Sequence, residues 1–404
     1  MPESGCKGAG CWCYHRTPEG IDYTHPAFIN ADGTSRIRCI WDQSIPFRGQ
    51  DSDSTQAAAA GERSGKASGQ EPLAGRRPDI VGYGTEYTRD DINRALASTD
   101  PWSVVPCRDP EGHGTFMAGV AGGTENPDNG FRGVAPLVEF AVVKCKPCKE
   151  NLKEYYRLST SQPCFMENDI MMGVRYLNNV AYQQQKPLVI CIGTGTSLGS
   201  HNQGGALGEV LQSYGSLKGV VIVTAGGNEA NAAHHYHSPV MEANGETDVE
   251  LKVAGGREGF TMDLWCDAPK LCSVGLISPG GEYSGKVYAR LGARQRLDFF
   301  LEETMVDVEY LLVSFESGDE CIRMRFRTPQ EGIWRIRVFN ETNLPTDFDI
   351  WLPIRGFVSE ETVFLRPDPD ITLCEPSNNA QVITTSYYQG ASRSVAIESS
   401  RGYN

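Results

Sequence analysis

The stretch VVIVTAGGNEA, residues 220–230, decides the fold class because it joins a continuous apolar run to a glycine turn. A second run, LVICI at residues 188–192, also lacks alternation between apolar and polar side chains. Such runs are typical of parallel strands whose two sheet faces are covered by helices. The region from about 104 to 235 therefore predicts an α/β domain built on a parallel sheet.

Periodic segments around these two strands complete the α/β pattern. VEFAVV, at residues 138–143, reads as a short apolar strand. Apolar residues recur at helical spacing from Ile170 to Ala181, after a cap at Asn168 or Asp169 and before Pro187. AQVITTS, at residues 380–386, predicts a further strand of the same domain.

Between about residues 240 and 375 the hydrophobic period changes to two. Residues 249–253, 322–327 and 334–338 alternate apolar side chains with polar ones, and every polar position in the last two stretches is arginine. This pattern predicts half-buried antiparallel strands in an inserted β-sandwich of jelly-roll type. We expect the alternating arginines to lie on the solvent face of their strands.

These patterns divide the chain into four segments. Residues 1–19 show no helix or strand period and form an aberrant N-terminal segment. The first part of the α/β domain covers 20–239, the sandwich covers 240–375, and 376–404 return to the α/β domain. Within the first part, residues 47–78 are rich in Gly, Ser, Ala and Gln and predict a long exposed loop.

Composition excludes several classes of protein. The chain has 404 residues, of which 40% are hydrophobic and 22% charged, so it can form a large core. Its formal net charge of -14 disfavours a nucleic-acid partner. No window approaches the about 18 apolar residues of a membrane span, so none is expected. The first twenty residues lack a secretory-signal pattern.

Cysteine usage predicts thiols and no metal centre. The chain has 13 cysteines, and this odd, scattered set fits reduced thiols better than a closed disulfide framework. Cys145 and Cys148 form a CxxC pair, but Cys164 is the only nearby third thiol and no matching pair follows. Zinc binding is therefore the less expected use of this pair.

Two polar side chains occupy positions suited to catalysis. DPEGHGTFMAGVAGG, residues 109–123, places His113 between two glycines at the start of a small-residue helix, where an imidazole can act as a general base. Asn228 follows the strand at 220–225, and an amide there can donate to an oxyanion for about 3 kcal/mol of transition-state binding. The alternatives are a structural histidine and a left-handed turn asparagine.

The order of these motifs resembles the subtilisin-like serine peptidases of the S8 family over residues 20–404. GHGT followed by FMAGVAGG is similar to the family's histidine motif and AGGNEA to its oxyanion-hole motif, which implies His113 as base and Asn228 as oxyanion donor. ICIGTG resembles the substrate-binding strand, which implies substrate contacts at Gly193, Thr194 and Gly195. The inserted jelly roll further resembles the Csp-type subtilases of spore-forming Firmicutes.

The resemblance is fragmentary at both ends of the chain. GIDYTHP matches from Gly20, and this register places Pro18 where the family has its catalytic aspartate, with Asp22 at a second, non-catalytic aspartate. Codons for Tyr14 to Arg16, shifted by one base, can encode Ile-Ile followed by Asp or Glu, so we hypothesise that residues 1–19 are an out-of-frame translation. SSRG, at 399–402, is similar to the segment before the family's serine motif, which does not appear up to Asn404.

The resemblance implies a serine endopeptidase that acts on proteins or peptides by acyl transfer and needs no organic cofactor. Calcium often stabilises this family, but no loop here has a clear run of calcium ligands. Without an assigned aspartate and serine, the 404-residue chain is expected to be nearly inert. The alternative is a non-catalytic pseudopeptidase that binds a peptide or partner protein through the retained cleft.

Three weaker interpretations stay open. GTSLG, at 195–199, is a formal GxSxG that would make Ser197 a nucleophile with His201 or the HHYH histidines at 234–237 as base, but no helix pattern follows it. HHYH also suggests a metal site, although polar residues after a loop are commoner. Carbohydrate binding by the sandwich rests on fold analogy alone.

Overall fold

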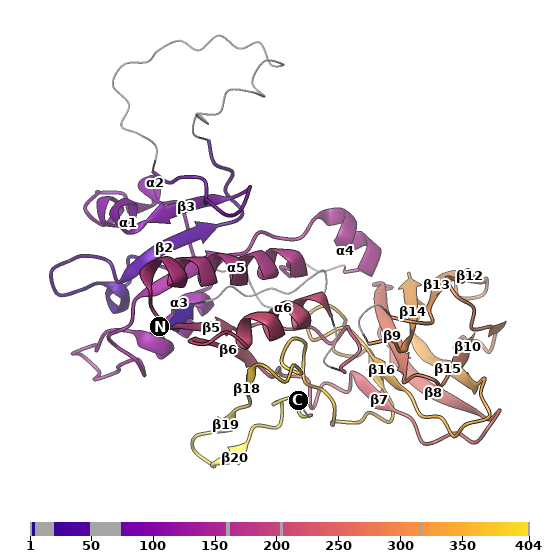
Figure 1. The fold of residues 1–404 in the computed structure, drawn as a ribbon. Coiled ribbons are helices and arrows are strands. Elements are labelled where there is room, and N and C mark those ends of the chain that lie inside the picture. Colours follow the sequence, from indigo (N-terminus) through magenta and orange to yellow (C-terminus); the bar gives the residue numbers. More distant parts are fainter. Residues whose placement is uncertain are drawn as a thin grey trace, which may run out of the picture. The chain divides into compact units, whose positions relative to one another are not determined.

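The computed structural model describes residues 2–4, 20–48, 74–158, 162–202, 205–314 and 317–402 (Figure 1). The chain divides into two compact units, of which the first comprises residues 1–5 and 19–146 and the second residues 6–18 and 147–404. Apart from residues 2–4, the predicted N-terminal segment 1–19 lies outside the described residues, as does the greater part of the predicted loop 47–78. The limits predicted for the four segments stay predictions.

The first unit is a small α/β assembly built on β2. Strand β2 (Ile37–Asp42) pairs in parallel with β4 (Phe140–Lys144) and antiparallel with β3 (Thr85–Thr88). Its other elements are β1 (Pro2–Ser4), the short 3-10 helix η2 (Pro26–Phe28), α1 (Arg89–Leu96), α2 (Pro101–Val104) and α3 (His113–Gly122). Apolar side chains of β2, β4 and α1 form one buried cluster, so the predicted strand at 138–143 is confirmed as β4.

The second unit begins with the parallel strands that the apolar runs predict. Strand β5 (Leu188–Ile192) pairs in parallel with β6 (Val220–Ala225), and β6 pairs in parallel with β18 (Ile383–Thr385). Helices α4 (Glu150–Tyr156), α5 (Glu167–Gln184) and α6 (Ala206–Gly215) belong to the same unit. The parallel sheet is therefore confirmed. Within the described ranges, no helix has the length and apolar character needed to cross a membrane.

Two antiparallel sheets complete the second unit (Figure 1). One has the order β11-β10-β15-β8-β17 and the other β12-β13-β14-β9-β16-β7. One hydrophobic cluster takes residues from both sheets, such as Trp334 and Met324, so the predicted half-buried strands are confirmed. The bounds are β7 (His235–His237), β8 (Glu246–Val253), β9 (Phe260–Cys266), β10 (Cys272–Ile277), β11 (Tyr283–Val287), β12 (Arg294–Phe299), β13 (Thr304–Leu311), β14 (Glu320–Arg327), β15 (Gly332–Asn340), β16 (Asp349–Trp351) and β17 (Val363–Phe364), followed by the hairpin β19 (Tyr388–Gln389) and β20 (Ser394–Val395).

The prediction of solvent-facing arginines is wrong for β14. Arg323 lies opposite Asp263 of β9 and donates to both of its carboxylate oxygens, at 2.9 and 2.8 Å. The Asp263 side chain is 0% exposed and that of Arg323 is 12% exposed. The rings of Tyr156 and Tyr155, at the end of α4, lie 5.4 Å from the guanidinium of Arg323 and 4.2 Å from that of Arg325. Helix α4 thus covers the arginine face of β14, which the alternation of apolar and polar residues predicts to be exposed to solvent.

We predict that Asp263→Asn lowers the free energy of unfolding by about 3–5 kcal/mol, because it leaves the buried Arg323 charge uncompensated. Asp248→Asn is the matched control, since Asp248 makes the same two-bond contact with Arg337, at 2.7 and 2.8 Å, on an exposed face. That change should cost less than about 1 kcal/mol. Urea unfolding measures both values, and equal losses would contradict the account.

Candidate active site

A carboxylate and a left-handed glycine fix the start of the helix that carries His113. Gly112 has φ 78° and α3 begins at His113, which is half-buried. The Asp109 carboxylate accepts hydrogen bonds from the Gly112 amide at 3.1 Å and from the Thr115 amide at 2.7 Å and hydroxyl at 2.6 Å. Because these bonds satisfy amides of the first turn, the backbone at His113 is held in place. The predicted helix start is confirmed.

The Asp22 and Asp42 carboxylates of the first unit accept hydrogen bonds from residues in their own turns. The Asp22 amide donates to the Thr115 hydroxyl at 2.9 Å, while the Asp22 carboxylate accepts from the amide and hydroxyl of Thr24 at 3.0 and 2.5 Å. Asp42 accepts from Ser44 in the same way and lies 3.7 Å from the Lys144 ammonium. The hydrogen bonds of Asp22, Asp42 and Asp109 therefore go to groups other than His113, and Pro18 lies outside the described residues.

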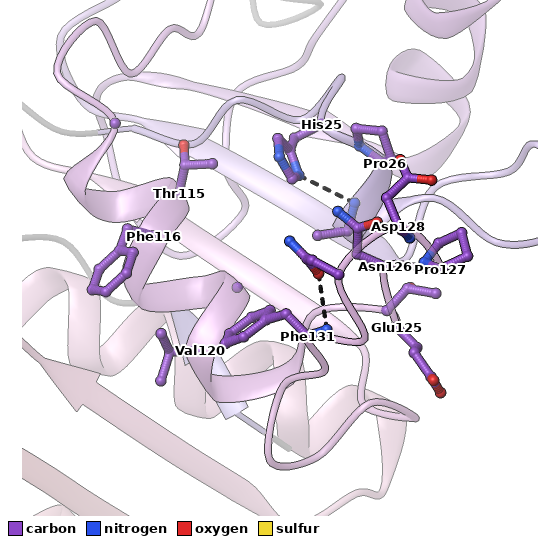
Figure 2. Close-up of a pocket in the computed structure, with 15 residues that line it drawn as sticks. His25, Pro26, Thr115, Phe116, Val120, Glu125, Asn126, Pro127, Asp128 and Phe131 are labelled. Atoms are coloured by element: carbon purple, nitrogen blue, oxygen red, sulfur yellow. Dashed lines mark hydrogen bonds between the residues drawn. The ribbon is translucent and has the colours of Figure 1, made fainter. Parts of the chain in front are cut away.

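A pocket of about 740 Å³ adjoins α3 within the first unit (Figure 2). Phe116 and Val120 of α3 form one wall, His25 and Pro26 lie across from them, and the loop at 124–131 closes the side. Phe116 is 66% exposed and Phe131 is 51% exposed, so the pocket presents unpaired apolar surface. Gly112 and Thr115 are among its lining residues, but His113 is not.

Asn228 lies in a loop that is tied down on both sides. It follows β6 after two glycines, and Gly227 has φ 110°, while Asn228 is not among the residues with positive φ. The Gly227 carbonyl accepts from the Ser400 amide at 3.0 Å, and the Glu229 amide donates to the Ser400 hydroxyl at 2.9 Å. Asn228 itself is exposed and makes no hydrogen bond to the described residues. The left-handed turn asparagine is therefore the wrong interpretation, because Gly227 takes that conformation.

The predicted substrate segment follows β5 and is mostly covered. Gly193 and Thr194 are buried and Gly195 is half-buried. The next residue, Thr196, exchanges backbone hydrogen bonds of 3.0 and 2.8 Å with Glu375. A Cβ atom at Gly195 would lie 2.6 Å from the Cβ of Cys374, so this position requires glycine. Substrate contact by residues 193–195 stays a prediction.

Cys374 connects these two segments, and the sequence analysis missed it. Its amide donates to the Gly226 carbonyl at 2.9 Å, and a Cβ atom at Gly227 would lie 2.5 Å from its sulfur. The structure therefore brings the Asn228 loop and Gly195 together around Cys374 in the second unit, while His113 belongs to the first. Burial raises the pKa of the Cys374 thiol well above its ordinary value, so this thiol is not a nucleophile at neutral pH.

Comparison with known proteins assigns the family. The model of the subtilase family (Peptidase S8) matches residues 19–246, more than half of the chain. The chain belongs to the subtilase family. This membership implies a serine-type peptidase that acts on proteins or peptides, as the motifs predict.

A solved structure supports the same assignment. The structure of the Clostridium perfringens CspB protease matches with a TM-score of 0.76 and 28% sequence identity, over 100% of this chain and 72% of that one. The predicted resemblance to Csp-type subtilases is therefore confirmed. A search of curated proteins finds no match.

The GxSxG alternative finds no support in this subtilase. The Ser197 hydroxyl is buried and donates to the Leu352 carbonyl at 2.6 Å, and His201 contacts the main-chain carbonyl of Ser197 at 2.9 Å rather than its hydroxyl. Helix α6 begins only at Ala206, so no helix follows the serine as a nucleophile elbow requires. Ser197 is a structural residue.

The HHYH histidines of this subtilase contact different carboxylates. His234 lies 3.2 Å from Glu229, whereas His235 and His237 lie 2.9 and 2.8 Å from Asp349. In the described part of the chain, no group that could hold a metal ion includes these histidines. The metal interpretation of this motif is not supported.

The expectation that all cysteines are thiols is wrong for one pair. Cys148 and Cys164 form a disulfide, with their Cα atoms 5.6 Å apart. The two residues meet because the backbone at 147 and 165 forms an antiparallel bridge, a contact that the CxxC spacing does not reveal. One sulfur of the CxxC pair is therefore committed to a covalent bond and not to a metal.

Proposed function

We propose that the chain has the fold and site of a subtilisin-like serine endopeptidase, a class that hydrolyses peptide bonds by acyl transfer. The observation that carries this proposal is the Asn228 loop. An exposed amide stands at the carboxyl end of a parallel strand, makes no hydrogen bond to the described residues, and has a backbone fixed by Ser400 and Cys374. A preorganised donor of this kind stabilises the negative charge that develops on a carbonyl oxygen during acyl transfer.

The other residues take the roles that the family motifs imply. His113, at the fixed start of α3, accepts the proton of the attacking hydroxyl and returns it to the leaving amine. Residues 193–195 bind the substrate backbone, and the two antiparallel sheets form the inserted jelly roll. The substrate is a protein or peptide, and this chemistry needs no organic cofactor and no catalytic metal.

The 404-residue polypeptide itself should be nearly inert towards peptide bonds. No serine or aspartate in it is assigned to the triad, and loss of the serine from such a triad lowers turnover on the order of a million-fold. Transition-state binding by the remaining groups still leaves a rate on the order of 10³-fold above water. That residual activity gives a way to test Asn228 in the chain as it stands.

We predict slow, saturable hydrolysis of an N-acyl-peptide p-nitrophenyl ester by the purified chain. His113→Ala should leave this rate nearly unchanged, because the residual catalysis of a triad without its serine comes from the oxyanion donor and from binding. Asn228→Ala should lower it about a hundredfold, because one oxyanion donor is lost. Initial rates at saturating ester, after subtraction of the buffer rate, measure both effects.

Asn231→Ala is the control for the second variant. Asn231 lies in the same loop and is exposed, but its side-chain oxygen accepts a hydrogen bond from Arg355 at 2.5 Å. The Asn231→Ala variant should hydrolyse the ester at the rate of the unmodified chain. A fluorophosphonate probe should label none of these proteins. Stoichiometric labelling, or ester hydrolysis that Asn228→Ala leaves unchanged, would contradict the proposal.

A second candidate function is a non-catalytic pseudopeptidase that binds a peptide or partner protein. The pocket beside α3 favours it, because Phe116, Val120 and Phe131 expose apolar surface inside a concave site. Exposed apolar side chains that gather in a pocket are typical of ligand and partner recognition. This function does not require a nucleophile.

For that candidate we predict that Phe116→Asp weakens binding of a fluorescent Gly/Ser peptide carrying a single phenylalanine by about tenfold or more, because ring burial is lost. Val134→Asp is the control, since Val134 is 88% exposed in the same unit but does not line the pocket. Fluorescence anisotropy gives both affinities. Equal affinities in the two variants would show that the pocket is not the peptide site.

A further inference from the structure

Two cysteines and one glutamate meet at the end of three strands in the second unit, far along the chain from the residues discussed above. Cys266 ends β9 and lies directly opposite Glu320, the first residue of β14. Cys272 begins β10 in the other antiparallel sheet. The two sulfurs lie 3.5 Å apart, and the ligand atoms of all three residues lie within 4.8 Å of one another.

The Glu320 carboxylate is buried without a counter-charge. Its exposed fraction is 1%, and those of Cys266 and Cys272 are 1% and 0%. One oxygen accepts the Cys272 amide at 2.6 Å, but the other, Oε1, has no hydrogen-bond partner among the described residues. Nor does any described lysine, arginine or histidine pair with it. A carboxyl oxygen buried in this way is costly unless a hydrogen-bond donor or a cation satisfies it.

The spacing of the two sulfurs suits a shared ion better than a covalent bond. A disulfide brings its sulfurs to about 2.05 Å, well inside the observed separation. Two thiolates that lie about 2.3 Å from a tetrahedral zinc ion are about 3.8 Å apart, close to the 3.5 Å seen here. Thiolate ligands select soft or borderline cations over calcium and magnesium.

We propose that Cys266, Cys272 and Glu320 bind one thiophilic divalent cation of the zinc class. The orphaned Glu320 oxygen and the two sulfurs supply three protein ligands, and binding releases the thiol protons to the buffer. The Asp347 carbonyl, 3.7 Å from the Cys266 sulfur, or a water molecule completes the coordination. Since the burial of all three side chains leaves little access for a substrate, the site is structural.

The proposed ion would join the two antiparallel sheets. Cys266 and Glu320 belong to the six-stranded sheet and Cys272 to the five-stranded one. The short connection between the two cysteines is already anchored, because Lys270 pairs with Asp347. A cation that binds only this folded arrangement stabilises it against unfolding. The inference does not rest on the proposed peptidase function.

Cobalt(II) titration of the full, reduced and metal-stripped chain tests the proposal. Cobalt should bind with a sulfur-to-metal charge-transfer band and the intense visible bands of a tetrahedral thiolate site, at one ion per chain, and zinc should displace it. Cys272→Ser and Glu320→Gln should each weaken cobalt binding by at least about a hundredfold, since even residues behind the ligands cost 10–100-fold. Zinc should also raise the Tm of the unmodified chain but not of these variants.

Two controls separate the cluster from other thiols and carboxylates. Cys321→Ser removes a buried thiol next to Glu320 in sequence, and Glu302→Gln changes another buried carboxylate with an unpartnered oxygen. Both should bind cobalt like the unmodified chain. If Cys272→Ser does not fold, as judged by circular dichroism, the near-isosteric Glu320→Gln decides. Absence of the charge-transfer band, equal binding by Glu320→Gln, or a Cys266–Cys272 disulfide found by mass spectrometry would overturn the proposal.

Discussion

The close packing of Cys374 between two glycine-bearing loops is the constraint on which the candidate site depends. Strands β5 and β6 run in parallel and in register, so the segments that follow them emerge at the same edge of the sheet. A Cβ atom at Gly195 or Gly227 would lie within 2.6 Å of Cys374 side-chain atoms. Only glycine permits this approach, and the resulting packing holds the loop of the exposed Asn228, the proposed oxyanion donor.

The antiparallel part of the second unit is stabilised by different means. Its core is apolar and shared by both sheets, yet its polar faces hold buried or half-buried ion pairs such as Asp263 with Arg323. The proposed cation at Cys266, Cys272 and Glu320 adds a link of a third kind between those sheets. Arg323 lies on a strand whose alternation the sequence displays, but Asp263, Cys266 and Cys272 lie on strands whose burial shows no such alternation.

Sequence periodicity predicted the elements well because it depends on local burial. The limits of β5 and β6 matched the apolar runs, and His113 began a helix as the glycine motif indicated. Sequence periodicity failed where a segment distant in the chain determines the environment of a side chain. Helix α4 covers Arg323 and Arg325, and the bridge near Cys164 creates a disulfide. The role of Cys374 was not predictable, because no pattern around it signals contact with Gly195 or Gly227.

The contact between Cys374 and Gly227 is tested most directly by two glycine substitutions at the ends of β6. Gly227→Ala and Gly219→Ala both place a side chain at positive φ, 110° and 89°, but only the first meets another residue within 4 Å. Gly227→Ala should lower the free energy of unfolding by at least about 1 kcal/mol more than Gly219→Ala, because its added methyl group overpacks against Cys374. The amides of Glu229 and Cys374 should also exchange hydrogen faster in Gly227→Ala than in the unmodified chain. Equal losses of unfolding free energy in the two variants, with unchanged exchange at those amides, would contradict this packing constraint.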